Sequence, residues 1–363
     1  MNLRSVFITG GAGFIGTKLA HGLKVARPDV SIWIYDNLHP QVHGPNAAPP
    51  VTSEGQTFIY GDVADLAALQ AAIKVAKPEL IYHLAAETGT GQSYDEPVRY
   101  CAVNIGGTAN LVEAVREVGG VRRIVLSGSR AVYGEGGYRA ANGQEYVGLP
   151  RRPEEMQRGN FAVSLPAGAQ APAVPIPCHS GLPPSPASLY ASTKLMQEYL
   201  LSQLGMGADW KAVLLRFQNV YGPGQSLRNP YTGVLSVFVR HLLSGKQISI
   251  FEDGKIARDF VYIDDVVEAL LSAGVREIDH GVVIDIGSGQ AATIADIAGI
   301  LAGILGFERD SYYVSGEFRI GDIRHACAAI DKALALLEWS PRINLETGLR
   351  QFAEWAKGEL RRD

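Results

Sequence analysis

A short apolar run that leads into a cluster of glycines constrains the fold of this chain more than any other feature. Residues 4–9, RSVFIT, have the composition of a buried strand, and GGAGFIG follows them before an amphipathic segment, TKLAHGLKVA. Glycines at a strand-to-helix turn permit positive φ and let backbone N–H groups approach a pyrophosphate, and the N-terminal end of the helix adds positive potential. The turn therefore predicts a phosphate-binding site.

A second apolar run, VSIWIYDN, ends near Asp36, which lies twenty residues after Gly16. A strand, a glycine turn, a helix and a later acidic residue form the dinucleotide-binding fingerprint. The Asp36 carboxylate could accept hydrogen bonds from both ribose hydroxyls and would repel a 2′-phosphate. We therefore predict that the chain binds NAD rather than NADP.

Strands and helices continue to alternate along the chain. The later apolar runs are TFIYGD, LIYHLAA, RRIVLSGS and KAVLLRF, and helical patterns lie between them at about 65–76, 98–118 and 188–204. Continuous apolar strands that alternate with helices are typical of a parallel sheet with both faces covered. Together with the right-handed crossover rule, they predict an α/β fold with a Rossmann-type doubly wound parallel sheet.

Two changes in this pattern predict the domain organisation. Residues 134–187 are dense in Gly and Pro. Loops of this length are usually lids, binding loops or disordered segments, and we expect a lid over the substrate, with partial disorder as the alternative. We predict a Rossmann domain over 1–217 that includes this insertion, and a smaller, interleaved substrate-binding portion over 218–363, of which about 260–305 returns to the Rossmann domain.

Composition and charge exclude several classes of function. The formal charge of −4 gives no basic surplus for neutralising nucleic-acid phosphates. No apolar run has the length of a signal peptide or a membrane span, and the three cysteines form no CxxC pair. We expect a cytoplasmic protein with no nucleic-acid or membrane partner. We also expect no metal, because Cys178, His179 and the distant Cys101 are too few for a tetrahedral zinc site.

The stretch SLYASTK places Tyr190 and Lys194 four residues apart. On a helix these positions share one face, and a nearby ammonium favours the phenolate of a tyrosine that ordinarily titrates near pH ~10. We interpret the pair as a proton acceptor whose pKa is lowered by Lys194. The same spacing also occurs in exposed surface pairs, so the interpretation requires a site around it.

These motifs occur in the order found in a known family. The segments are TGGAGFIG, GDVAD, HLAAETG, LSGSRAVYG, YASTK, LRFQNVYGPG, RDFVYIDD and FRIGDIR. With them the chain resembles the extended short-chain dehydrogenase/reductase family, in its nucleotide-sugar epimerase/dehydratase branch, over nearly all its length except 134–187. The resemblance implies NAD as the cofactor, a nucleotide sugar as the substrate, and a homodimer formed through the helices at 98–118 and 188–204.

The resemblance also implies roles for individual residues. Ser129, Tyr190 and Lys194 would be catalytic, with Ser127 as the weaker alternative to Ser129. Tyr190 would take the proton of a sugar hydroxyl, Lys194 would keep the tyrosine ionised and bind the nicotinamide ribose, and Ser129 would hydrogen-bond the reacting oxygen. The predicted cofactor-binding residues are Gly10, Gly13, Phe14, Ile15, Gly16, Asp36, Asn37, Asp62, Val63, Leu84, Ala85, Ala86, Asn104 (the family's structural asparagine), Tyr190, Lys194 and Phe217. The predicted substrate-binding residues are Thr88, Gln92, Ser129, Arg130, Asn219, Arg258 and Arg319.

The two positions after Ser129 indicate which reaction follows. The 4,6-dehydratases of the branch carry Asp-Glu there, whereas this chain has Arg130 and Ala131, so elimination of water is not expected. Epimerisation needs no further acid or base. ETGTGQS and SRAVYGEG resemble the bacterial dTDP-L-rhamnose 4-epimerases, which implies interconversion of dTDP-L-rhamnose and dTDP-6-deoxy-L-talose. A UDP-hexose 4-epimerase, a nucleotide-sugar 4-ketoreductase and a non-catalytic dinucleotide sensor are the alternatives.

Overall fold

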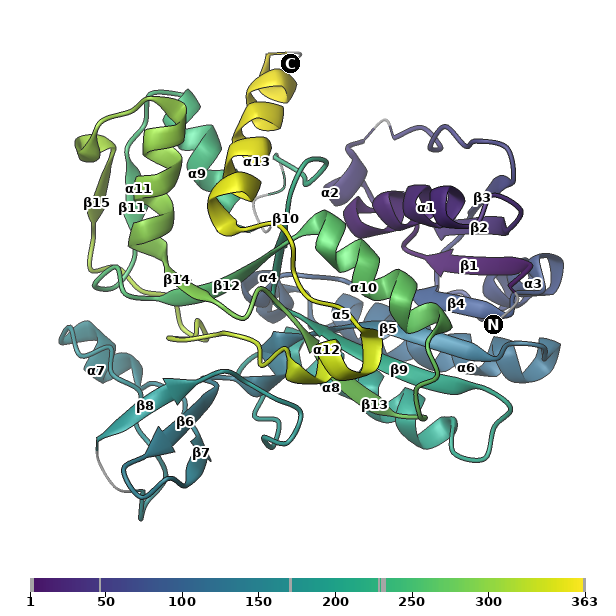
Figure 1. Ribbon diagram of the computed structural model, residues 1–363, viewed down its shortest axis with the longest axis horizontal. Helices are drawn as coiled ribbons and strands as arrows, with labels where there is room; N and C mark the ends of the chain where they lie inside the picture. The colour runs from purple at the N-terminus through teal and green to yellow at the C-terminus, as the bar shows by residue number, and fades with distance from the viewer. Residues whose placement is uncertain (1–2, 46, 170–171, 228, 230–232, 362–363) are drawn as a thin grey trace.

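A seven-stranded sheet runs through the centre of the computed structural model, which describes residues 3–45, 47–169, 172–227, 229 and 233–361 (Figure 1). All of its neighbouring strands are parallel. In spatial order the strands are β3 (Gln56–Tyr60), β2 (Ser31–Asp36), β1 (Ser5–Thr9), β4 (Leu80–His83), β5 (Arg123–Ser129), β9 (Lys211–Phe217) and β13 (Val282–Ile286). The predicted doubly wound parallel sheet is confirmed.

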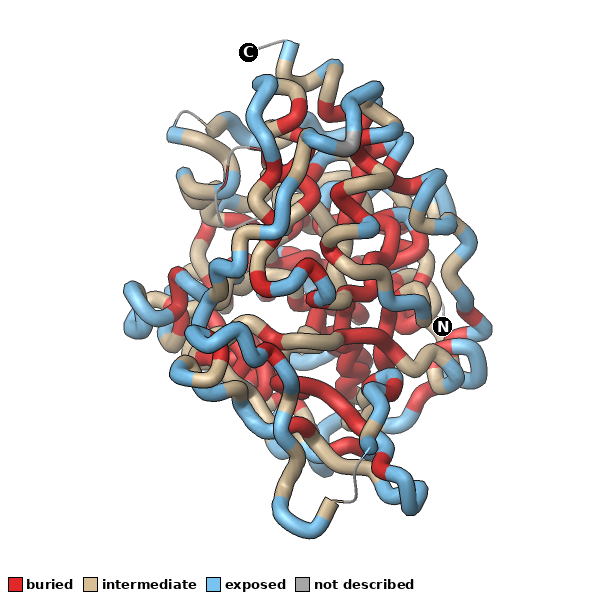
Figure 2. The backbone as a smooth tube through the Cα atoms, turned by 90° about the vertical axis from the view of Figure 1, so that its left-hand side faces the viewer, coloured by how far each residue is buried: buried red, intermediate tan, exposed pale blue. Residues whose placement is uncertain are grey.

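Helices cover both faces of this sheet because its strands are apolar on both sides. In β1, Val6 and Ile8 pack into one hydrophobic core and Phe7 packs into another on the opposite face, as the alternation of side chains along a strand requires. Figure 2 shows the buried backbone gathered in the interior. The first core lies under α1 (Phe14–Ala26) and α10 (Ile263–Val275); the second lies under α3 (Leu66–Ala76), α6 (Gly107–Val118) and α8 (Leu189–Leu204).

The order of the strands reverses between β1 and β4. From β1 the chain first adds β2 and β3 on one side and then crosses to add β4, β5, β9 and β13 on the other. In open parallel sheets, ligands bind outside the carboxyl ends of the strands at such a switch point. The segments that follow β1, β2, β4, β5 and β9 therefore meet at one edge.

The predicted helix at 98–118 is interrupted. It begins as α5 (Pro97–Tyr100), continues as a π-helical turn, η1 (Cys101–Gly106), and ends as α6. Two further short helices precede it, α2 (Pro40–His43) and α4 (Thr90–Asp95). Apolar periodicity alone does not distinguish a π-turn from an α-turn, and such turns are frequent at functional sites.

The insertion 134–187 has a sheet of its own. It follows a short 3-10 turn, η2 (Arg130–Tyr133), and comprises β6 (Gly137–Ala140), β7 (Glu145–Val147), α7 (Pro153–Gln157) and β8 (Ala173–Ile176). The three strands are antiparallel in the order β7-β6-β8, and they lie apart from the large sheet, at the lower left of Figure 1. Residues 170 and 171 lie outside the described residues.

The C-terminal portion adds two small sheets and a group of helices. The first sheet contains β10 (Asn219–Tyr221), β12 (Ala257–Tyr262) and β14 (Ala291–Thr293), and the second pairs β11 (Ile248–Ile250) with β15 (Tyr312–Val314). The remaining elements are α9 (Val234–Leu243), α11 (Ile294–Leu305), η3 (Arg309–Ser311), α12 (Asp331–Leu337) and α13 (Leu345–Leu360). None of the helices in the described part of the chain combines the length and apolar composition of a membrane span.

Only part of the segment 260–305 returns to the large sheet. The helix α10 packs on α1 and β5, and β13 forms the seventh strand. In contrast, α11 packs against α9 and α13 in the C-terminal portion. The returning segment is therefore shorter than predicted, because α11 buries its apolar face outside the Rossmann domain.

Candidate active site

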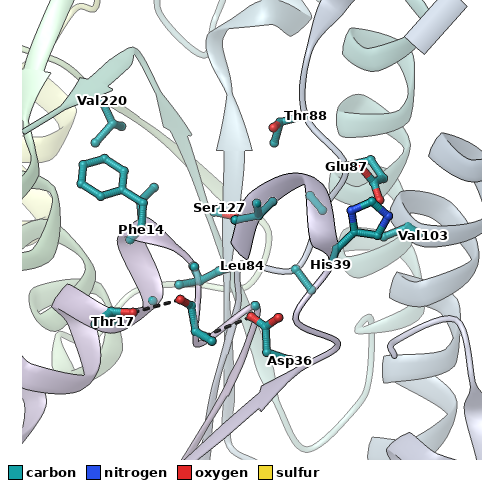
Figure 3. A pocket seen from close by; sticks show the side chains of 18 of the residues that line it. Phe14, Thr17, Asp36, His39, Leu84, Glu87, Thr88, Val103, Ser127 and Val220 are labelled. Atoms are coloured by element: carbon teal, nitrogen blue, oxygen red, sulfur yellow. Dashed lines mark hydrogen bonds between the residues drawn. The ribbon is translucent and has the colours of Figure 1, made fainter. Parts of the chain in front are cut away.

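A cleft of about 590 Å³ lies at the carboxyl ends of the central strands (Figure 3). Fifteen of the sixteen predicted cofactor-binding residues line it. These are Gly10, Gly13, Phe14, Ile15, Gly16, Asp36, Asn37, Asp62, Val63, Leu84, Ala85, Ala86, Tyr190, Lys194 and Phe217. Their roles toward a cofactor stay predictions, but the fold brings them to one place.

The glycine turn forms the floor of the cleft. Gly10 has φ +66, and a Cβ there would lie 2.7 Å from the backbone nitrogen of Ala85 on the loop after β4. A Cβ at Gly16 would lie 2.5 Å from the carbonyl oxygen of Gly10. The helix α1 begins at Phe14, and no side chain caps its first turn. Its first N–H groups are therefore available to an anionic ligand, in keeping with a pyrophosphate.

Asp36 lies at the end of β2 and is held by the backbone. One carboxylate oxygen accepts the N–H of Ala12 at 3.0 Å and the other accepts the N–H of Leu38 at 2.8 Å. Figure 3 shows the side chain at one end of the cleft. A carboxylate oxygen has more than one lone pair, so Asp36 retains capacity for ribose hydroxyls. The residues present fit a dinucleotide such as NAD.

Asn104 is the predicted cofactor-binding residue that does not line the cleft. It is buried in the π-turn η1. Its Oδ1 accepts the N–H of Glu87 at 2.8 Å, and its Nδ2 donates to the Glu87 carbonyl at 3.1 Å and to Thr193 Oγ1 at 2.9 Å. Asn104 thus ties the loop after β4 to α8 and positions the cleft wall from behind.

A second cavity of about 200 Å³ adjoins the cleft. Ser129, Tyr190, Phe217 and Gln218 line both cavities, so the predicted catalytic tyrosine lies where they meet. Of the predicted substrate-binding residues, Ser129, Arg130 and Asn219 line the second cavity, and Thr88 lines the cleft.

Three predicted substrate-binding residues line neither cavity. Gln92 is buried and exchanges hydrogen bonds with Gln41 at 2.7 and 2.8 Å. Arg258 is buried and donates to Asp322 Oδ1 at 2.5 Å, so its contact with the second cavity is indirect, through Asp322. Arg319 is exposed, with its guanidinium carbon 4.8 Å from the centre of the Phe251 ring. In this structure none of the three is placed to touch a ligand in the cavities.

Ser129, Tyr190 and Lys194 come together as predicted. Ser129 ends β5, and it lines both cavities with Tyr190, close enough to lower the pKa of that tyrosine. Tyr190 and Lys194 lie in the first turns of α8, which Ser188 caps by accepting the N–H of Ala191 at 3.2 Å. Ser127, the alternative to Ser129, instead donates to the His83 carbonyl at 3.2 Å. The geometry favours Ser129 as the partner of Tyr190.

The structure corrects the prediction about the pKa of Tyr190. Burial raises the pKa of Tyr190 above its ordinary value of 10.0, while the Ser129 hydrogen bond and the positive charge of Arg130 lower it in part. Removal of water disfavours the phenolate more than these neighbours favour it. The cation that lowers the pKa of Tyr190 in this structure is Arg130.

Lys194 has its own electrostatic environment. Burial lowers the pKa of Lys194 to about 8. The carboxylate of Glu198, one turn further along α8, has the opposite effect and raises this pKa in part. Glu198 also accepts two hydrogen bonds from Arg216 at 2.9 and 2.7 Å, and both side chains are buried. The ammonium thus lies beside a fixed, buried ion pair.

Two residues near Tyr190 were not predicted. Gln218 is buried, and neither its side-chain oxygen nor its nitrogen has a hydrogen-bond partner among the described residues. Asp322 lines the second cavity, and the only sequence signal for it is its place inside the FRIGDIR motif. The position of Gln218 between Phe217 and Asn219, which were predicted, could have indicated it.

The insertion does not cover the site. None of its described residues up to Pro186 lines either cavity, and Ala187 is the first that does. The expectation of a lid over the substrate is therefore wrong for this structure: the hairpin strands turn the segment away from the sheet edge. Within it, Cys178 is a buried free thiol and His179 pairs with Glu145 at 2.9 Å. Among the described residues, no three His, Cys, Asp or Glu side chains are grouped to hold a metal ion.

A glycine turn, an acidic residue after β2 and a Ser-Tyr-Lys set in one cleft define a dinucleotide-dependent enzyme of the short-chain dehydrogenase/reductase class. Residues 6–156 and 160–287 match the model of the NAD dependent epimerase/dehydratase family, and the chain belongs to this family. The predicted family resemblance and its cofactor, NAD, are confirmed.

Similar proteins extend over the whole chain. A dTDP-L-rhamnose 4-epimerase of Burkholderia thailandensis is 40% identical, over 99% of this chain and 96% of the relative. A UDP-glucose 4-epimerase of Mycolicibacterium smegmatis is 29% identical, over 97% and 98%. Among solved structures, UDP-glucose 4-epimerase from Thermotoga maritima with UDP-glucose has a TM-score of 0.77 at 27% identity, over 98% of this chain and 99% of that one. The structure of MoeE5 with UDP-glucuronic acid and NAD gives the same values.

Proposed function

We propose that this protein is an NAD-dependent 4-epimerase of a nucleotide-activated 6-deoxyhexose, and that it interconverts dTDP-L-rhamnose and dTDP-6-deoxy-L-talose through a 4-keto sugar. The observation that carries the proposal is the 40% identity, over 99% of this chain, to a dTDP-L-rhamnose 4-epimerase. The placement of Ser129, Tyr190 and Lys194 where the two cavities meet supports the chemistry.

The cofactor would lie along the cleft. The first turn of α1 would bind its pyrophosphate, Asp36 its adenosine ribose, Asp62 and Val63 its adenine, and Lys194 the ribose at the other end. When bound, NAD supplies a hydride acceptor for C4 of the sugar and returns the hydride on the opposite face. All of these residues line the cleft.

The protein's own side chains handle the proton. Tyr190 as phenolate takes the proton of the C4 hydroxyl and returns it when the ketone is reduced. The hydroxyl of Ser129, which lines both cavities beside Tyr190, would donate to the C4 oxygen as its charge develops. Arg130 lines the same cavity, and its charge favours the phenolate and the sugar oxygen alike. No step beyond oxidation, turnover of the sugar and reduction is required.

The cavity beside Tyr190 lacks the side chains for elimination. Asp322 is the one carboxylate among the described residues that line it, and Arg258 binds that carboxylate at 2.5 Å. Arg258 and Arg130 oppose the effect of burial and keep the pKa of Asp322 below its ordinary value, so this carboxylate has no proton to donate at neutral pH. Ala131 lines the cavity at the position where a dehydratase would carry an acid. These contacts support epimerisation rather than 4,6-dehydration.

The test is to incubate the purified protein with dTDP-L-rhamnose without added cofactor and to identify the products by NMR. We expect the C4 epimer, because an epimerase that recycles its NAD needs none from solution. A panel that includes UDP-glucose and UDP-glucuronate separates the sugar specificities. Accumulation of a 4-keto sugar with stoichiometric reduction of added NAD(P)+ would indicate a 4-ketoreductase working in reverse. Absence of any C4 epimer across the panel would contradict the proposal.

We also infer a cytoplasmic homodimer formed through α5, η1, α6 and α8. The outer faces of these helices expose large apolar side chains, among them Val98 at 80%, Met196 at 40% and Tyr199 at 43%. A second copy of the chain would cover such a face. Light scattering coupled to size exclusion should give twice the chain mass, and the double substitution V98D/M196D should reduce it to one.

A further inference from the structure

A cluster of charged side chains, with Glu135, Arg151 and Glu252 buried at its centre, joins the insertion to the C-terminal portion. We call it the brace cluster and define it as Glu135, Arg151, Glu252, Asp253 and Arg324. Its members come from three segments that lie far apart in the sequence: the beginning of the insertion, the turn after β11 and the loop before α12. Buried charges are retained in proteins where they are paired and hydrogen-bonded.

Arg151 is the centre of the brace cluster. Its side chain is 2% exposed, and each of its three nitrogens donates to a different partner. Nε donates to Glu135 Oε1 at 2.8 Å, Nη1 to Glu252 Oε1 at 2.7 Å and Nη2 to the carbonyl of Asp322 at 2.8 Å. The rigid guanidinium fork therefore fixes three segments relative to one another.

Arg324 completes the cluster from the other side. Its backbone N–H donates to Glu135 Oε2 at 2.6 Å, and its Nη1 donates to Glu252 Oε2 at 2.8 Å and to Asp253 at 2.6 Å. Glu252 is buried and adopts φ +56, a left-handed conformation that costs free energy for a residue other than glycine. Two arginines on one carboxylate, together with a backbone hydrogen bond to Glu317 at 2.7 Å, hold it there.

The segment that Arg151 holds is a wall of the second cavity. Gly321, Asp322 and Ile323 line that cavity together with Ser129, Arg130 and Tyr190, which come from earlier segments of the chain. Arg151 binds the Asp322 carbonyl, while the Asp322 side chain binds Arg258. Arg151 itself lines neither cavity, so it acts on this wall from behind.

We propose that Arg151 is a positioning residue for the sugar-binding wall 321–323, and that the insertion 134–187 serves as a brace for that wall. Its relevance to catalysis rests on the proposed function, because the wall would bind the sugar of a nucleotide sugar. Without Arg151, the buried Glu135 would lose its guanidinium partner and keep only the backbone N–H of Arg324, and the Asp322 carbonyl would lose its donor, so the loop would no longer be fixed.

The first experiment is kinetic and uses Arg151→Gln, Arg151→Lys and a matched control, Arg139→Gln. Arg139 belongs to the same insertion but forms an exposed pair with Glu145. With a nucleotide sugar that the wild type turns over, we expect R151Q to raise KM at least about tenfold while kcat changes less than about threefold and the copurified NAD stays unchanged. R151K should raise KM less than R151Q does, and R139Q should have the KM and kcat of the wild type. A fall in kcat or in NAD content at unchanged KM would overturn the proposal.

The second experiment needs no substrate. Hydrogen–deuterium exchange of residues 318–324 should be faster in R151Q than in the wild type and R139Q, while exchange in β1 and α8 is the same in all three. Equal exchange in 318–324 would overturn the positioning role even if the kinetics changed. If the wild type turns over no nucleotide sugar, the proposed function fails and this measurement still decides the role of Arg151. Should R151Q not fold, E135Q removes the carboxylate shared by Arg151 and Arg324 and is tested in the same two ways.

Discussion

The cleft over the large sheet and the smaller cavity beside it are built from different parts of the chain. Glycines, backbone N–H groups and strand ends form much of the cleft, and they come from consecutive units of one sheet. The smaller cavity is lined by η2, the start of α8, β10 and the loop 321–323. Its wall is held by an ion pair, Arg258–Asp322, and by a hydrogen bond from Arg151 to the Asp322 carbonyl, both between distant segments. The cleft thus depends on local geometry, whereas the cavity depends on long-range electrostatic contacts.

This difference suggests how the two parts vary independently. A dinucleotide site that is built mainly from backbone groups does not depend on the substrate. The same sheet can therefore support enzymes with different substrates. The cavity can change its specificity through loops that do not belong to the sheet. Substitutions in the cleft should therefore alter cofactor binding, and those in the cavity should alter substrate binding or pH dependence with NAD retained.

Tyr190→Phe tests the residue that the two parts share, and we expect it to have the largest effect. Removal of the hydroxyl deletes the proton acceptor, so kcat should fall by about 10³-fold. Copurified NAD, measured by absorbance after denaturation, should stay near one per chain. Tyr146→Phe is the control, because that hydroxyl bonds Gln144 at 2.8 Å in the insertion, away from the site. Retention of most of the activity by Y190F would exclude the proposed mechanism.

Asp36→Asn tests the cleft alone. Loss of the negative charge removes repulsion toward a 2′-phosphate and weakens the grip on the ribose, so NAD retention should fall by about tenfold to a hundredfold and binding of NADP should improve. Dialysis followed by titration with each cofactor measures both changes. The exposed Asp29→Asn should bind NAD as the wild type does. A variant that still excludes NADP would show that another group selects the cofactor.

Arg130→Gln tests the cavity. Arg130 lowers the pKa of Tyr190, although burial leaves that pKa raised. Its removal should raise the pKa of Tyr190 further. Because the phenolate is the active form, the acidic limb of the kcat profile should move to higher pH, and activity at a fixed neutral pH should fall. NAD content should not change.

Serine variants supply the controls for this pH shift. Ser129→Ala should move the limb in the same direction, since the Ser129 hydrogen bond also lowers the pKa of Tyr190. Ser127→Ala should leave the limb in place, because Ser127 bonds the His83 carbonyl. A shift in S127A without one in S129A would reverse the assignment of the two serines.

Lys194→Met tests the buried ammonium, and in the absence of nucleotide it should stabilise the fold. The pKa of Lys194 is lowered by burial from 10.5 to about 8. Below about pH 8 the folded state must hold a buried ammonium, and this penalty fades as pH rises from 8 to 10.5. Without nucleotide, K194M should therefore be more stable than the wild type at pH 7, by up to about 3 kcal/mol, and gain little at pH 10.5. Urea unfolding at both pH values measures this, with the exposed Lys74→Met as control; a gain independent of pH would point to packing instead.

The parts of the site that sequence predicts are those with local causes. Gly10, Gly13, Gly16, Asp36 and the Tyr190–Lys194 pair each depend on a turn, a strand end or a helical spacing, and all of them line the cleft. Arg130 and Asp322 influence each other across about 190 residues of sequence, and no periodicity indicates such a contact. The direction of the pKa shift of Tyr190 also could not be predicted, since it depends on burial by elements that are distant along the chain.

The fold of the insertion also depends on contacts between distant residues that the sequence does not indicate. Its Gly and Pro content indicated an irregular segment, but the segment forms a small sheet that depends on pairing between β6 and the distant β8, with Gly137 opposite Ile176. Arg151 has no motif around it, and its three partners are known only from the fold.

The last strand that the chain contributes to the large sheet is β13. It pairs with β9, although the elements from β10 to α10 lie between the two strands in the sequence. A fragment that stops at Phe217 would therefore leave the backbone groups of β9 unpaired along one side, with Val213 and Leu215 beside them. An exposed apolar edge of this kind recruits other chains and aggregates. We therefore expect the two portions to fold only as one polypeptide, and engineering of either should keep the whole chain.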